Sequence, residues 1–192
     1  TRQDEPGIGR FNIFARYWAE QGHQIYVVAG MINYITGKKS DEYKGKFFAK
    51  EKDGENTAVF RVFDSVLGYR TFLGRLWSYF SFLISALIAG LFLAPKPDVV
   101  IASSPPIFIG VLGYLVSIFK RTRFIFEVRD LWPDEAVELG FLKNKILIRM
   151  SLWFERFLYK NSRSIVVNSP GLKSFLIERK SLAARKISIV PN

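Results

Sequence analysis

Apolar stretches of two lengths alternate along this chain. Short runs rich in β-branched and aromatic residues predict buried strands at 24–29, 57–63, 98–103, 123–128, 164–168 and 186–190. Longer runs with an apolar residue every three or four positions predict helices at 9–20, 75–94, 106–119, 144–159 and 170–180. Because helices separate strands that are apolar along their whole length, the sequence predicts an α/β fold with one parallel sheet and helices on both of its faces.

Two segments depart from this alternation. Residues 31–56 are polar and rich in Gly and Lys, and we interpret them as a long surface excursion. Residues 76–94 contain no charged side chain, which is enough apolar length to consider a membrane span. A crossing there would put the first two predicted strands on the other side of the membrane from the rest of the sheet. We therefore favour a buried or membrane-dipping helix, and an integral membrane protein stays an alternative.

The composition indicates one folded domain. The chain has 192 residues, of which 49% are hydrophobic and 23% charged, as in ordinary globular proteins. It has no Cys and one His, so we predict no disulfide and no metal site. His23 directly follows Gly22, which favours a structural role at a turn over a role as general base. The first residues form no secretory signal, and without an initiator Met we expect that residues precede Thr1.

The charge adds a constraint on partners. With 28 Lys and Arg against 17 Asp and Glu, the formal net charge is +11, which favours nucleic acid, an anionic membrane or a phosphorylated ligand as partner. The basic residues are most concentrated from residue 141 onward. We find no helix-turn-helix, zinc finger or aromatic RNA-binding signature, which disfavours nucleic acid.

The predicted helix at 144–160 gives this charge a surface. At ~100° per residue its basic residues fall within about 60° of one another, and an apolar arc lies beside them. The basic residues are Lys145, Arg149, Arg156 and Lys160, and the apolar arc is Ile146, Met150, Trp153 and Phe157. Such a helix can lie on an anionic bilayer, and a core helix with a solvated basic face explains the pattern equally well.

Candidate ligand residues follow the predicted strands, because parallel sheets bind ligands beyond the carboxyl ends of their strands. Ser103 and Ser104 come at the end of one strand. Capping of the next helix by Ser104, with Pro105 in its first turn, is the favoured explanation, and a contact with a sugar hydroxyl is the alternative.

The segment EVRDLWPDE at 127–135 ends a central strand and is the most informative stretch. A carboxylate and a guanidinium group can hold sugar hydroxyls, and a Trp ring can pack on the apolar face of a pyranose. We predict Arg129 and Trp132 as ligand-binding residues and Asp130 as catalytic. Asp134 and Glu135 are explained by the helix macrodipole, which favours acids in a first turn.

The segment PGIGR at 6–10 opens the first predicted helix with two glycines. Their backbone N–H groups could approach an anion, so Gly7, Gly9 and Arg10 are further candidates for ligand binding. Asn12 stands where the dinucleotide fingerprint has its third glycine, and a tight loop before a helix is the plain alternative.

Together these segments resemble the N-terminal domain of family-four glycosyltransferases of the GT-B fold, in particular the bacterial polysaccharide branch of fucosamine and colanic-acid transferases. The matching segments are EPGIGR at 5–10, EQGHQI at 20–25, DVVIASSPP at 98–106 and EVRDLWP at 127–133. The final residues VPN resemble the start of the linker between the two domains of that family.

The resemblance implies a Rossmann-like, acceptor-binding half of a retaining glycosyltransferase, with its first strand missing. The full-length enzyme would move a sugar from a nucleotide-sugar donor to a lipid-linked or saccharide acceptor in surface polysaccharide biosynthesis. A donor-binding domain should follow residue 192, so this domain is expected to bind no cofactor and to be inactive alone. The expected location is cytoplasmic, peripheral on the inner face of the cell membrane. The alternative is a stand-alone basic module that binds a membrane or nucleic acid without catalysis.

Overall fold

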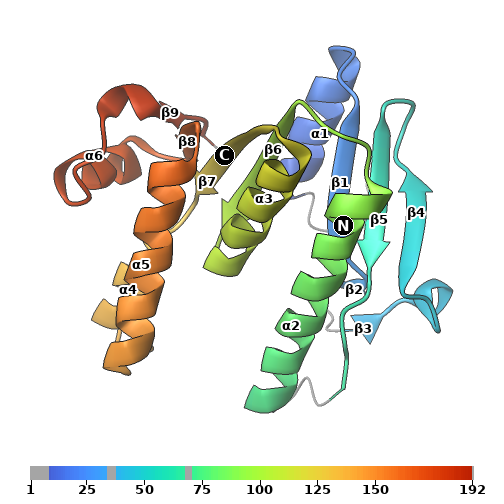
Figure 1. The fold of residues 1–192 in the computed structure, drawn as a ribbon, viewed down its shortest axis with the longest axis horizontal. Helices are drawn as coiled ribbons and strands as arrows, with labels where there is room; N and C mark the ends of the chain where they lie inside the picture. The colour runs from blue at the N-terminus through green and yellow to red at the C-terminus, as the bar shows by residue number, and fades with distance from the viewer. Residues whose placement is uncertain (1–8, 34–37, 68–70, 192) are drawn as a thin grey trace. The chain divides into compact units, whose positions relative to one another are not determined.

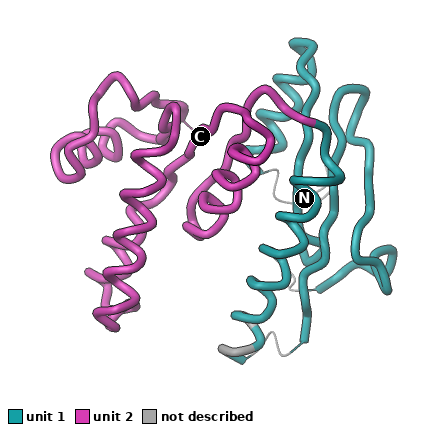
Figure 2. The backbone as a smooth tube through the Cα atoms, in the orientation of Figure 1, with its two compact units in different colours: residues 1–95 teal, residues 96–192 magenta. Residues whose placement is uncertain are grey.

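The computed structural model describes residues 9–33, 38–67 and 71–191, without the side chains of 72, 73 and 75 (Figure 1). Internal contacts divide the chain into two compact units, Thr1–Pro95 and Lys96–Asn192 (Figure 2). A single domain stays a prediction.

Unit 1 is built on a three-stranded sheet in the order β1-β5-β4. β1 and β5 are parallel, and β4 runs antiparallel along the other side of β5. Helices α1 and α2 lie on opposite faces of this sheet (Figure 1). The elements are α1 Arg10–Glu20, β1 Ile25–Gly30, β2 Ile32–Asn33, β3 Lys38–Lys39, η1 Asp41–Tyr43, β4 Phe48–Lys52, β5 Thr57–Val62, α2 Phe72–Ile88 and the π-helical turn η2 Ala89–Leu93.

The surface excursion predicted for residues 31–56 is wrong. This segment contains the short antiparallel pair β2 and β3 and the edge strand β4. Sequence analysis missed β4 because three of its five residues are charged, and only alternate residues are partly buried. An edge strand with charged side chains is a common way to prevent pairing with another chain.

Unit 2 contains a parallel four-stranded sheet in the order β6-β7-β8-β9. Its core includes Phe126, Leu158 and Ile165. A Cβ atom on Gly110 would lie 2.6 Å from the Phe126 ring, so glycine lets α3 approach the sheet closely. The elements are β6 Val99–Ser104, α3 Ile107–Lys120, β7 Arg123–Val128, α4 Asp134–Glu138, α5 Lys145–Asn161, β8 Ser164–Val167, α6 Pro170–Glu178, η3 Ala184–Lys186 and β9 Ile187–Ile189.

The α/β class and the parallel sheet are confirmed, and the predicted elements recur within a few residues of their predicted ends. The sheet of unit 2 is parallel throughout, whereas unit 1 adds the antiparallel strand β4. Helix α2 begins before the predicted residue 75 because the side chain of Thr71 accepts a hydrogen bond from the Gly74 N–H at 3.0 Å and caps the helix. Gly22 has φ +84 and the His23 N–H donates to the Trp18 carbonyl at 3.0 Å, which closes the end of α1.

Candidate functional site

The loop after β7 is fixed between the ends of its two neighbouring strands. The backbone N–H of Arg129 donates to the carbonyl of Ser104 at the end of β6, at 3.2 Å. On the other side, Nδ2 of Asn168 after β8 donates to the carbonyl of Arg129 at 3.1 Å. These bonds gather the polar residues that follow three parallel strands at one edge of the unit 2 sheet, as sequence analysis expected.

Arg129 and Asp130 both point polar groups into solvent from this loop. Their side chains are exposed, and among the described residues neither forms an ion pair. Both are therefore available to a ligand. Trp132 is half-buried and packs against the core of unit 2, so its ring is held in place. The site thus combines exposed charged groups with an anchored aromatic ring.

Ser103 and Ser104 lie on opposite faces of β6, because successive strand residues alternate. Ser104 is 3% exposed and shares its face with the core residue Ala102. Its predicted role as helix cap is wrong, since Pro106 is the N-cap residue of α3 and no side chain caps that helix. The physical reason is that Ser104 pairs with Val128 as part of β6, which extends one residue beyond its predicted end. Pro105 also precedes the helix.

Glu127 lies in the informative segment 127–135, but it was not predicted as a site residue. It is 2% exposed and lies opposite Ser103 in the sheet register. Paired residues project from the same face, so Glu127 and the half-buried Ser103 form a polar pair on the face away from Phe126. An acidic residue within an apolar run is the sequence signal that could have identified it.

Of the candidates at the start of α1, Gly7 lies outside the described residues. Gly9 is the N-cap of α1, with φ −68 and ψ 146, a conformation open to any residue. Arg10 places its guanidinium group 4.5 Å from the centre of the Phe14 ring, a cation–π contact. These residues belong to unit 1, and their role in ligand binding stays a prediction.

In unit 1 the carboxylate of Asp64 has a structural role that the sequence did not reveal. Asp64 follows β5 and accepts hydrogen bonds from the backbone N–H groups of Met31 and Ile32, at 3.1 and 3.2 Å. A Cβ atom on Gly30 would collide with this carboxylate, so a side chain at position 30 would displace it from its hydrogen bonds. Burial raises the pKa of Asp64 above its usual value, although these hydrogen bonds oppose the shift. Its acceptor capacity is used to close the loop after β1.

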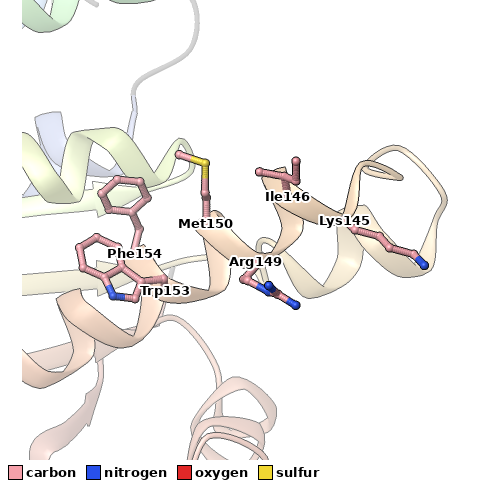
Figure 3. Close-up of a pocket in the computed structure, with 6 residues that line it drawn as sticks. All are labelled: Lys145, Ile146, Arg149, Met150, Trp153 and Phe154. Carbon is pink, nitrogen blue, oxygen red and sulfur yellow. The ribbon is translucent and has the colours of Figure 1, made fainter.

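The predicted basic residues of α5 are all exposed, and apolar side chains lie exposed beside them. Trp153 is 59% exposed and stacks on Phe157, with ring centres 5.5 Å apart. A surface groove of about 460 Å³ follows the first half of this helix. It is lined by Lys145, Ile146, Arg149, Met150, Trp153 and Phe154 (Figure 3). The basic face continues with Arg156 and Lys160.

The inner face of α5 carries a buried ionic network. Nζ of Lys180 donates to Asp134 at 2.5 Å and to Glu155 at 2.9 Å, and the Tyr159 hydroxyl donates to Glu155 at 3.0 Å. Burial raises the pKa of Glu155 above its usual value, while Lys180 opposes the shift. Asp134 begins α4 directly after the candidate loop, so its pairing with Lys180 is a second explanation besides the macrodipole.

No group of His, Cys, Asp and Glu within the described part of the chain could hold a metal ion. No curated protein matches the chain. The family model for the Glycosyl transferase 4-like domain matches residues 10–192, which includes nearly all of both units and the polar edge of the unit 2 sheet. The chain therefore belongs to the Glycosyl transferase 4-like domain family.

Proposed function

We propose that this chain is the acceptor-binding half of a retaining glycosyltransferase. The full-length enzyme would move a sugar from a nucleotide-sugar to a lipid-linked or saccharide acceptor in bacterial surface polysaccharide biosynthesis, with fucosamine and colanic-acid transferases as its relatives. Family membership supports sugar transfer. The observation that carries the acceptor role is the exposed pair Arg129 and Asp130 beside the anchored ring of Trp132.

Each of these residues suits one part of a glycosylated acceptor. In transfer, an acceptor oxygen bonds to the anomeric carbon as the bond to the nucleotide phosphate breaks, and the proton of the acceptor hydroxyl goes to the departing phosphate oxygen. The Asp130 carboxylate would accept a hydrogen bond from that hydroxyl and orient it. Arg129 would bind a phosphate of a lipid-linked acceptor, and Trp132 would support a sugar ring. The nucleotide-sugar would be held by a donor-binding domain of the full-length protein.

A membrane location on the cytoplasmic side would bring such an acceptor within reach. The exposed basic residues of α5 support binding to an anionic leaflet, since each basic residue near such a surface contributes about 1 kcal/mol. The exposed apolar residues of the same helix, Ile146, Met150 and Trp153, would insert between headgroups. The protein would then be peripheral on the inner face of the membrane.

The test is transfer by the full-length enzyme carrying Asp130→Ala. We expect kcat/KM to fall by about 10- to 100-fold, because a hydrogen bond to a charged group contributes about 1.5–3 kcal/mol. Initial rates with a panel of labelled nucleotide-sugars and a polyprenyl-phosphate sugar acceptor measure this. Glu138→Ala, which removes another exposed acid nearby, should transfer normally. Full activity in a folded Asp130→Ala enzyme contradicts the assignment.

The alternative is a module that binds a membrane or nucleic acid without catalysis. The same basic face of α5 would serve either partner, so salt dependence does not separate them. Binding to polyprenyl-phosphate vesicles should exceed binding to duplex DNA at equal salt. Tighter binding to DNA would favour the nucleic-acid module instead.

A further inference from the structure

From Leu76 onward, helix α2 has its serines inside and large apolar residues outside. Its buried side chains include Ser78, Ser81 and Ser85, which fall within about 60° of one another at ~100° per residue. The exposed side chains of the helix are large and apolar. Ile84 is 59% exposed, and Phe92 in the adjoining turn η2 is 78% exposed. Further exposed residues are Leu76, Trp77, Tyr79, Phe80, Ile88 and Leu93. This arrangement is the reverse of an ordinary surface helix.

The serines bind α2 to the chain that follows β5. The Ser85 hydroxyl donates to the carbonyl of Phe63, and the backbone N–H of Ser65 donates to the hydroxyl of Ser81 at 2.9 Å. Phe82 also packs close to Gly30 at the end of β1. The helix therefore lies along the sheet of unit 1 with one side covered.

These contacts bear on how the helix could meet a membrane. The segment Leu76–Leu93 is long and apolar enough to cross a bilayer, with a mean hydropathy of 1.9. A span would break the hydrogen bonds that Ser81 and Ser85 form with the segment after β5, and the polar backbone groups of that segment would lose these partners. Insertion of the outer side alone keeps every one of these hydrogen bonds.

The chemistry of the outer side fits lipid. No charged residue occurs between Arg75 and Lys96. Trp77 and Tyr79 near the first turn have amphipathic rings of the kind enriched at the headgroup level. The net charge of +11 is complementary to an anionic leaflet.

We infer that the outer side of α2 and η2 docks unit 1 on a lipid bilayer, with the helix lying in the plane of the membrane at the level of the headgroups and the first acyl carbons. The serine side stays on the protein. This contact is apolar and hence independent of the basic face of α5. The inference is also independent of sugar transfer, because it is tested by lipid binding alone.

The test is binding of the full-length protein to zwitterionic phosphatidylcholine vesicles in about 1 M salt, where the Debye length is about 3 Å and electrostatic binding is suppressed. Flotation should recover the wild-type protein with the vesicles. Ile84→Glu and Phe92→Glu should each lower the partition coefficient by about tenfold or more, because each removes a large apolar side chain from lipid. Phe119→Glu, an equal change at an exposed position of α3, should bind like wild type.

A second measurement reports the depth of the helix. In a variant that keeps Trp77 and carries Phe at the other Trp positions, bromines near the headgroups should quench fluorescence more than bromines at the bilayer centre. An unchanged urea midpoint for Ile84→Glu and Phe92→Glu shows that the variants fold.

Three outcomes overturn the inference. The first is wild-type partition by both folded Glu variants. The second is strongest quenching from the bilayer centre, which indicates a span. The third is a loss of self-association in the two Glu variants, measured by sedimentation without lipid, while their lipid binding is unchanged. That result would assign the outer side of α2 to a protein interface.

Discussion

Helices α2 and α5 are both 17 residues long and both expose aromatic and aliphatic side chains, yet they distribute polarity in opposite ways. From Leu76 onward α2 has no charged residue, and its serines are buried against the protein. On α5 the outer side has basic residues beside the apolar arc. The inner side buries both the apolar Leu158 and the charged Glu155. One helix can meet lipid only through apolar contact, whereas the other adds charge.

The comparison shows that the period of a hydrophobic pattern does not fix its direction. A helical pattern places apolar and polar residues on different sides, but which side faces the sheet depends on partners elsewhere in the chain. For α2 those partners are Phe63 and Ser65, which bind serines. For α5 they include Lys180, which neutralises a buried acid.

The largest expected effect separates the two outer faces. Replacing Lys145, Arg149, Arg156 and Lys160 by Gln should lower affinity for anionic vesicles at low salt by about a thousandfold, because each basic residue near such a surface contributes about 1 kcal/mol. Flotation with phosphatidylserine vesicles measures it. Binding to zwitterionic vesicles in high salt should not change.

The matched control removes the same charge from unit 1. Lys44, Lys46, Lys50 and Lys52 are exposed, and their replacement by Gln should reduce anionic binding far less. Equal losses for the two quadruple variants would mean that overall charge, rather than the face of α5, attracts the membrane. The distinction between the helices would then be lost.

The next effect separates the two inner faces. Lys180→Met should lower the free energy of unfolding by about 3 kcal/mol, because breaking a buried pair strands a buried charge. Glu155 is 3% exposed and would lose its cation, while Asp134 can still turn to solvent. Urea unfolding near neutral pH measures this. A loss below about 1 kcal/mol would mean that the network contributes no more to the free energy of unfolding than an exposed ion pair does.

The pH dependence of this loss has a defined sign. Burial alone would lower the pKa of Lys180, but its hydrogen bonds to Asp134 and Glu155 raise it above the usual 10.5. The stabilisation is therefore complete below about pH 10.5 and is lost as pH rises through the folded-state pKa, by at most about 1.4 kcal/mol per pH unit for one proton. Wild type and Lys180→Met should thus converge in alkaline solution. A constant difference would exclude Lys180 as the titrating group.

Sequence reasoning succeeded where burial is reflected in composition. The strand at 123–128 is an uninterrupted apolar run apart from Arg123 and Glu127, and its predicted bounds match β7. It failed for β4, where the alternate, partly buried residues are Ala49 and the charged Glu51, because the strand lies at an edge and shows no apolar alternation. Sequence reasoning also failed for the role of Ser104. The last strand position and the helix-cap position differ by one residue, and only the pairing of Ser104 with Val128 shows that it belongs to the strand.

For the site, the sequence could indicate which residues are available but not how they are held. Arg129 and Asp130 were identified from their place after a strand, and the structure leaves both exposed. The bond from Asn168 to the Arg129 carbonyl joins residues 39 positions apart, so no local pattern contains it. The same holds for Asp134 and Lys180, which are 46 positions apart.

The smallest effect tests the inner side of α2 on its own. Ser85→Ala should lower the free energy of unfolding by about 1 kcal/mol, because the hydroxyl then no longer donates to Phe63 while its bonds within the helix have little net value. Tyr79→Phe removes a hydroxyl from the exposed side of the same helix and should unfold like wild type. Lipid partition should stay the same for Ser85→Ala, because the outer side is intact. Reduced partition with unchanged stability would mean that the serine side, instead of the aromatic side, meets the lipid.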